Sequence, residues 1–262
     1  MSAPATMPAE HGAAPARGTW VREVWASSVG KKVIVALTGT ILAVYIVLHV
    51  AGNLKAFQGA GGAEGPAIDR YAEWLRTVGE PAIPREGLLW TVRAILLICL
   101  VIHITGVIQL ARRNREARPA GYPAPRIKRS LASRTMLAGG LFLLAFIVFH
   151  ILHFTTGTIQ PSRFAEGAVY RNLDEAFSQP GFVVVYVLAS LTIAAHALHG
   201  VWSSTQTAGW DKPNRNPTFR RLSRFIALAT AIGFAAVPVA FWAGVMEDPP
   251  ADEPAASAEV AP

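Results

Sequence analysis

The stretch "VIVALTGTILAVYIVLHVAG", residues 33–52, contains no charged side chain and decides the fold class. About 20 consecutive apolar residues are enough to carry an α-helix across the hydrocarbon core of a bilayer. The run nevertheless contains a histidine, His49, near its end. An imidazole in hydrocarbon has a donor and an acceptor that must be satisfied, and leaving them unpaired is costly. The sequence therefore predicts a membrane-spanning helix with a polar group whose partners need to be found.

Four further apolar stretches follow this one, and together they define the architecture. Only 16% of the residues are charged and 52% are hydrophobic, whereas soluble domains have roughly 25% charged residues. We predict an all-α fold with one bundle of five transmembrane helices over residues 20–246, because no remaining stretch is long enough for a second domain. The five spans are expected near 33–52, 90–111, 135–156, 181–204 and 225–245.

The segments outside the spans divide into tails and surface helices. Residues 1–19 and 247–262 are rich in Ala, Pro and acidic residues, and we expect both tails to be disordered. The first tail has no early apolar run, which argues against a cleaved signal peptide. The segment 19–32 is expected to form a juxtamembrane helix that leads into the first span. Residues 65–79 have apolar residues at helical spacing and predict a helix on the outer surface, while 157–180 is expected to be an outer loop.

The net charge of +7 is distributed unevenly along the chain. The segments before span 1, between spans 2 and 3, and between spans 4 and 5 hold 17 Lys and Arg against 4 Asp and Glu. The other loops and the C-terminal tail hold 6 basic and 13 acidic residues. This alternation places the N-terminus in the cytoplasm and the C-terminus outside, and it explains the basic charge without nucleic acid. The basic segment 111–130 could also bind anionic lipid or an acidic partner subunit.

Spans 1 and 3 share a short sequence repeat, called the echo below. "GTILAVYIVLH" (39–49) aligns without gaps on "GLFLLAFIVFH" (140–150), and each has a glycine followed ten residues later by a histidine. Both spans run from inside to outside, so His49 and His150 should lie at the same depth near the outer end. His153 follows His150 in the same layer.

Spans 2 and 4 run in the opposite direction and carry the remaining histidines of the membrane region. At about 1.5 Å per residue, His103 and His196 lie roughly 12 Å from the inner end of their spans. His199 follows His196. The six histidines therefore form two layers, an outer one and an inner one, each drawn from two helices.

Two stacked b-type haems, each held by two axial imidazoles, suit this arrangement best. A single intramembrane histidine would more often be a hydrogen-bonded packing residue, but six in two layers favour a cofactor. A non-haem metal site would usually include carboxylates, and none of the spans contains Asp or Glu. A transporter would be expected to have interrupted helices, and Pro238 is the only proline inside a span.

Several segments resemble the cytochrome b membrane-anchor subunit of succinate dehydrogenase and fumarate reductase, of the single-chain, five-helix, di-haem type. The segments are "SSVGKKVIVALTGTILAVYIVLHVAGNLKAF" (27–57), "YAEWL", "HITGVIQLARRNREARPAGY", "SRTMLAGGLFLLAFIVFHILHF" and "AHALHGVWSSTQTAGW". The resemblance covers about 20–245. It implies a bacterial cytoplasmic-membrane protein with two haem b groups, which conducts electrons between an iron–sulfur subunit and a quinone, typically menaquinone. Succinate oxidation would occur on a partner flavoprotein subunit.

The resemblance also assigns the ligands residue by residue. It implies His49 with His150 for the distal haem, on the outer side, and His103 with His196 for the proximal haem. His153 and His199 would be secondary neighbours of a haem or quinone, or packing residues. No residue is assigned to the quinone. The alternatives are a di-haem subunit of another quinone-linked dehydrogenase and a non-haem metal membrane oxidase.

Overall fold

A computed structural model describes residues 19–61, 64–117, 131–160, 162–210, 212 and 214–246. These residues are helical throughout, apart from connecting turns, and contain no strand, as the sequence predicted. The α-helices are α1 (Thr19–Ala26), α2 (Ser28–Asn53), α3 (Ala67–Thr77), α4 (Gly87–Glu116), α5 (Leu131–Phe154), α6 (Val169–Phe177), α7 (Pro180–Thr207) and α8 (Asn216–Trp242), and a 3₁₀ helix η1 (Leu54–Gln58) follows α2. The C-terminal tail, and all of the N-terminal tail except Thr19, lie outside the described residues.

Five of these helices, α2, α4, α5, α7 and α8, are long and apolar enough to cross a membrane, which confirms the five predicted spans. Their flanks carry many large apolar side chains that are exposed in the described part of the chain. Leu37, Leu97 and Leu228, from three different helices, are each about 60% exposed. Soluble proteins rarely expose such extended apolar surface, whereas lipid requires it. The chain is therefore a multi-pass membrane protein.

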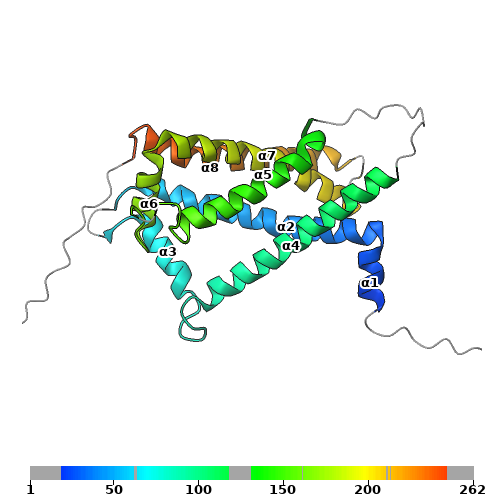
Figure 1. Ribbon diagram of the computed structural model, residues 1–262, viewed down its shortest axis with the longest axis horizontal. Coiled ribbons are helices and arrows are strands. Elements are labelled where there is room, and N and C mark those ends of the chain that lie inside the picture. The colour runs from blue at the N-terminus through cyan, green and yellow to red at the C-terminus, as the bar shows by residue number, and fades with distance from the viewer. Residues whose placement is uncertain are drawn as a thin grey trace, which may run out of the picture.

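The long helices form a bundle in which each has defined neighbours (Figure 1). α7 runs alongside α8 and also packs on α5 and α2, while α2 packs on α4, α7 and α8. Among the described residues, α2 does not pack along α5, and α4 does not pack along α7. A contact within either of these two pairs of helices must therefore be made by side chains rather than by closely packed backbones.

At the end of the bundle that the sequence places on the inner side, the predicted juxtamembrane helix is separate from the first span. α1 ends at Ala26, and Ser27 is extended, with its Oγ accepting a 2.8 Å hydrogen bond from the Gly30 amide at the start of α2. Serine is a favoured N-cap because its hydroxyl satisfies an amide that has no partner within the helix. Arg113, near the end of α4, donates to the Ala26 carbonyl at 2.8 Å and holds this junction in place.

α3, α6 and η1 form a cap at the opposite end, which the sequence places on the outer side (Figure 1). This cap holds a hydrophobic core cluster of the described residues. α3 confirms the helix predicted at 65–79. α6 lies in the segment that we expected to be a loop, and that expectation was wrong. Its buried side chains include Tyr170, Leu173 and Phe177, whose spacing is that of one helical face. They pack with Val237 and Phe241 at the end of α8.

Asp69 joins two helices of this cap. Its Oδ1 accepts a 2.8 Å hydrogen bond from the Tyr170 amide, at the beginning of α6. Asp69 thus satisfies an amide at the start of α6 from a different helix. Burial raises the pKa of the Asp69 carboxyl above its ordinary value, and the hydrogen bonds from the backbone amides of Tyr170 and Val169 oppose this shift.

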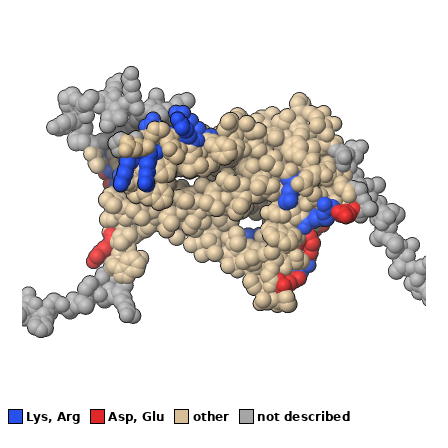
Figure 2. Space-filling view, turned by 180° about the vertical axis from the view of Figure 1, so that it is seen from behind, with Lys and Arg blue, Asp and Glu red and all other residues tan. Residues whose placement is uncertain are grey.

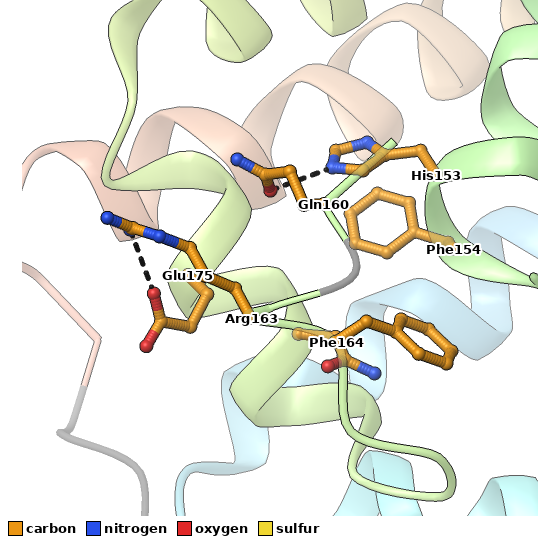
Figure 3. Close-up of a pocket in the computed structure, with 7 residues that line it drawn as sticks. His153, Phe154, Gln160, Arg163, Phe164 and Glu175 are labelled. Atoms are coloured by element: carbon orange, nitrogen blue, oxygen red, sulfur yellow. Dashed lines mark hydrogen bonds and ion pairs between the residues drawn. The ribbon is translucent and has the colours of Figure 1, made fainter. Parts of the chain in front are cut away.

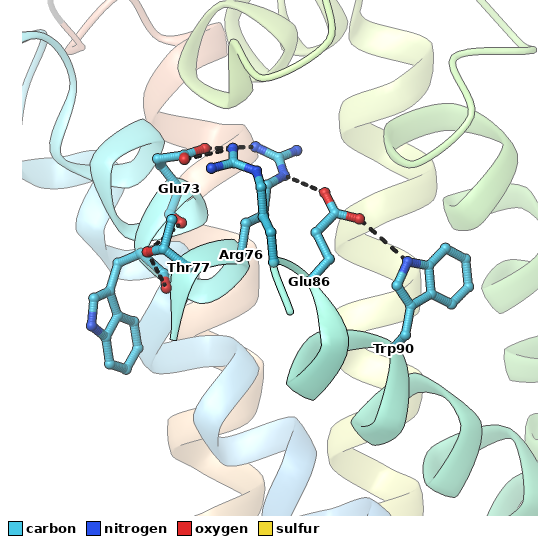
Figure 4. Close-up of polar contacts among 7 residues, drawn as sticks. Glu73, Arg76, Thr77, Glu86 and Trp90 are labelled. Carbon is cyan, nitrogen blue, oxygen red and sulfur yellow. Dashed lines mark hydrogen bonds and ion pairs between the residues drawn. The ribbon is translucent and has the colours of Figure 1, made fainter. Parts of the chain in front are cut away.

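The corner between α3 and α4 is held by side chains at the outer surface (Figure 4). Glu86, just before α4, has a positive φ of 62°, which is uncommon for a residue other than glycine. Its carboxylate pairs with Arg76 Nε at 3.5 Å and accepts from Trp90 Nε1 at 3.3 Å. Arg85 pairs with Glu73 at 2.6 Å across the same corner. These contacts fix the direction in which α4 enters the bundle.

Candidate functional site

The outer histidines of the echo face each other. His49 on α2 and His150 on α5 have ring centroids 5.9 Å apart, with the ring planes nearly perpendicular. Aromatic rings surround this pair. Tyr45 stacks on His49, Phe146 stacks on His150, and Phe234 of α8 lies 5.5 Å from the His49 ring. α8, which has no histidine, thus closes one side of the outer site.

The inner histidines form a second pair. His103 on α4 and His196 on α7 have ring centroids 6.4 Å apart. Each pair is drawn from two helices that do not pack along each other, so both pairs bridge the interior of the bundle. The structure therefore brings together the same residues that the sequence paired by depth.

The glycines of the echo lie beside the inner pair. A Cβ atom on Gly39 would come within 2.9 Å of His103 Cε1, so only glycine leaves room for this imidazole. Gly140 faces His196 Cε1 in the same way, at an ordinary contact distance of 3.7 Å. The histidine of each echo segment lies ten residues further along, or roughly 15 Å at the α-helical rise. α2 and α5 therefore each supply a glycine to the inner layer and a histidine to the outer layer.

The hydrogen bonds of His103 define its tautomer. Its Nδ1 lies 3.1 Å from the carbonyl oxygen of Val35, which can only accept, so Nδ1 carries the proton. The Thr38 hydroxyl lies 3.4 Å from the same nitrogen. Nε2 then holds a free lone pair. A histidine that donates from one nitrogen to a carbonyl and offers the other is a typical metal ligand.

His150 and His153 differ in what they contact. His153 is only 3% exposed, and both of its nitrogens have partners within the protein: Nδ1 lies 3.0 Å from the Tyr186 hydroxyl and Nε2 lies 3.3 Å from Gln160 Oε1 (Figure 3). His150 Nδ1 lies 3.3 Å from the same Tyr186 hydroxyl, and its Nε2 has no hydrogen-bond partner among the described residues. This geometry favours His150 over His153 as the partner of His49.

His199 lies one turn beyond His196 on α7. It is half-buried and makes no hydrogen bond or ring contact with any described residue. His196 is closer to the interior, and its Nδ1 is the only buried side-chain nitrogen or oxygen in the described part of the chain without a partner. Buried polar atoms are nearly always satisfied, so this nitrogen indicates that a further group belongs in the inner layer.

Both pairs have a spacing that fits one metal ion held between two imidazoles. Two metal–nitrogen bonds of about 2 Å, on opposite sides of an ion, separate the ring centroids by roughly 6 Å. The aromatic surroundings of the outer pair suit a flat apolar macrocycle. Within the described residues, no three His, Cys, Asp or Glu side chains converge, so the non-haem alternative has no ligand cluster there.

Several polar side chains near the two ends of the bundle are of a type that can contact a quinone, but they have partners within the protein. Glu64 lies 3.5 Å from Arg70, Asp69 accepts from the α6 backbone, and Glu73 pairs with Arg85. The Ser27 hydroxyl caps α2. None of these residues points to a quinone site.

Tyr186 is the residue of this site that the sequence analysis missed. It belongs to no recognised motif, and tyrosine is a common packing residue. One signal could have revealed it: Tyr186 lies ten residues before His196 on α7, so it reaches the outer layer by the same spacing that relates the two layers on α2 and α5.

Comparisons with models of protein families, with curated proteins and with solved structures find no match to this chain. The case for a function therefore depends on the residues and the geometry described above.

Proposed function

We propose that this chain is the di-haem b membrane-anchor subunit of a bacterial succinate:quinone oxidoreductase. It would carry electrons between an iron–sulfur subunit and a membrane quinone such as menaquinone, while a flavoprotein subunit oxidises succinate. The sequence resemblance supplies the identity of the complex. The two facing histidine pairs carry the argument from geometry, because each pair combines residues that are far apart in the chain.

The residues of each pair would together hold one haem. His49 with His150 would hold the outer, distal haem, and His103 with His196 the inner, proximal haem. A b-type haem, when bound, supplies a reversible one-electron carrier. The protein's own contribution is to orient the imidazoles, as Val35 does for His103, and to exclude water with the aromatic rings around His49 and His150.

The charge distribution supports a cytoplasmic N-terminus in the bacterial cytoplasmic membrane, with the iron–sulfur subunit docking on the inner face. Lys and Arg predominate at one end of the molecule (Figure 2). At this end, Arg220, Arg221 and Arg224 line one hollow at the start of α8. A basic inner surface attracts both anionic lipid and acidic partner surfaces.

A reduced-minus-oxidised absorbance spectrum of the purified complex tests the cofactor. We expect low-spin b-haem bands and two haems per chain, and their absence would exclude every cytochrome interpretation. Analysis of the co-purifying subunits tests the identity of the complex. A flavoprotein and an iron–sulfur subunit with succinate-dependent quinone reduction are expected, whereas haem with different partners would indicate another quinone-linked dehydrogenase.

A further inference from the structure

Four side chains form a continuous hydrogen-bonded chain from the outer histidine pair to the outer surface. Beginning in the interior, the order is His150, Tyr186, His153 and Gln160, with separations of 3.3, 3.0 and 3.3 Å. The last member lies beside the Arg163–Glu175 ion pair of the outer cap (Figure 3). Each link joins a nitrogen or oxygen that needs a partner in apolar surroundings.

The donor and acceptor capacities of these groups limit the chain to one of two directions. The Tyr186 hydroxyl has a single proton, so it can donate to one of the two imidazoles and must accept from the other. Gln160 presents its oxygen, which accepts, so His153 donates from Nε2 and its Nδ1 becomes an acceptor. Tyr186 therefore donates to His153 and accepts from His150.

This direction places the remaining proton of His150 on Nδ1. Its Nε2 then carries an unprotonated lone pair, which binding to a haem iron would require. The opposite direction would put the proton on Nε2 and prevent ligation. The orientation of the amide at Gln160, about 7 residues beyond His153 in the chain, thus decides the tautomer of His150.

The position of Tyr186 is fixed by the rings around it rather than by its hydroxyl alone. Its ring lies 5.1–6.0 Å from those of Phe146, Phe149, Phe154 and Phe177. These contacts come from α5 and α6, so the hydroxyl is held between the two histidines by the packing of both elements.

We propose that Tyr186, His153 and Gln160 form a positioning relay that holds His150 in its ligating tautomer and tunes the outer haem. This proposal depends on the proposed function. A hydrogen bond from a ligating histidine to an acceptor raises the basicity of the ligand. A more basic imidazole stabilises the oxidised iron, so a stronger acceptor at the surface end lowers the potential of the outer haem and a missing acceptor raises it.

The inner pair provides an internal reference. His103 donates to a backbone carbonyl, which no side-chain substitution in the relay changes. A change that acts through the relay must therefore alter the outer haem and leave the inner haem as it was, whereas general damage to the bundle would alter both.

The test is a redox titration of both haems, with electron paramagnetic resonance of the oxidised state, in the intact complex. Tyr186→Phe should raise the outer potential, so that a several-fold larger fraction of this haem is reduced at a fixed applied potential. Gln160→Glu should lower it, because a carboxylate accepts more strongly. Thr192→Val is the matched control: it removes a hydroxyl from the same helix, α7, where that hydroxyl donates to the Leu188 carbonyl outside the relay, and it should leave both potentials unchanged.

Each outcome either supports or overturns the proposed relay. Shifts of opposite sign at the outer haem alone support the relay, and so does selective loss of that haem in Tyr186→Phe. Unchanged potentials, or equal shifts of both haems, overturn it. If Tyr186→Phe fails to assemble, Gln160→Glu, which changes a loop residue, still provides the test. Absence of haem from the unaltered complex would instead overturn the proposed function.

Discussion

The outer and inner histidine pairs have similar spacing but different surroundings. His49 and His150 lie among aromatic rings, and His150 is oriented through side chains that lead to the surface. His103 is oriented by a backbone carbonyl and lies against a glycine, while His196 Nδ1 has no partner among the described residues. The outer layer is therefore defined by side-chain packing and the inner layer by close approach to the backbone.

This difference indicates how one bundle can distinguish two similar sites. Side chains can be exchanged one at a time, so the outer layer can be tuned by substitution. The inner layer depends on helix positions and on the absence of a side chain at Gly39, so a change there moves structure as well as chemistry. The following predictions test this contrast, beginning with the largest effect.

Removing a histidine of either pair should abolish one site and leave the other. We expect His49→Leu to eliminate the outer haem and His103→Leu the inner one, so that each variant retains one of two haems. The measurement is haem content and the low-temperature absorbance spectrum of the purified complex. His199→Leu serves as the control and should retain both haems. Loss of both haems in each variant would mean that the layers do not form independently.

Replacing Gly39 and Gly140 with alanine should have different effects, because the two glycines lie at different distances from the inner histidine rings. Gly39→Ala places a Cβ 2.9 Å from the His103 ring, and such overpacking typically costs about 1–3 kcal/mol unless the ring moves. We expect a shifted signal or reduced occupancy of the inner haem only. Gly140→Ala makes an ordinary 3.7 Å contact and should preserve both haem spectra. Equal behaviour of the two variants would contradict the close approach at Gly39.

The smallest effect is expected at the outer cap, where Asp69 joins α3 to α6. Because burial raises its folded-state pKa, the folded protein binds more protons than the unfolded protein between pH 3.8 and the raised value. The stability of the cap should therefore fall as the pH rises through this window, by less than about 1 kcal/mol because the group is half-exposed.

Asp69→Asn keeps the acceptor and removes the charge, so it should flatten this dependence. Asp69→Ala also removes the acceptor and should cost about 1 kcal/mol at every pH. Hydrogen exchange of the Tyr170 amide, which Asp69 binds, measures both effects. An unaltered slope in Asp69→Asn would assign the dependence to another group.

The bundle and the histidine pairs could be predicted because their signals are strong. Charge-free runs are long, and depth follows from a fixed rise per residue, so His49 could be matched to His150 and His103 to His196. The break at Ser27 could not be predicted in the same way, because a serine N-cap inside a helical pattern is a weak local signal.

α6 and Tyr186 were missed for a different reason. The apolar face of α6 is short and interrupted by polar residues, and it becomes helical by packing on α8. Tyr186 matters because its hydroxyl, on α7, contacts His150 and His153 on α5. A sequence pattern within a single helix cannot reveal contacts between two helices. Asp69 likewise acts on a helix that begins 100 residues later.

The ten-residue spacing from Gly39 to His49 has an electrical consequence. The layers it separates are roughly 15 Å apart, which is about half of a 30 Å hydrocarbon core. Moving one elementary charge across the whole core at 100 mV requires about 2.3 kcal/mol. An electron passing between the layers would thus exchange about 1 kcal/mol with the membrane voltage, enough to change the balance between the two sites several-fold.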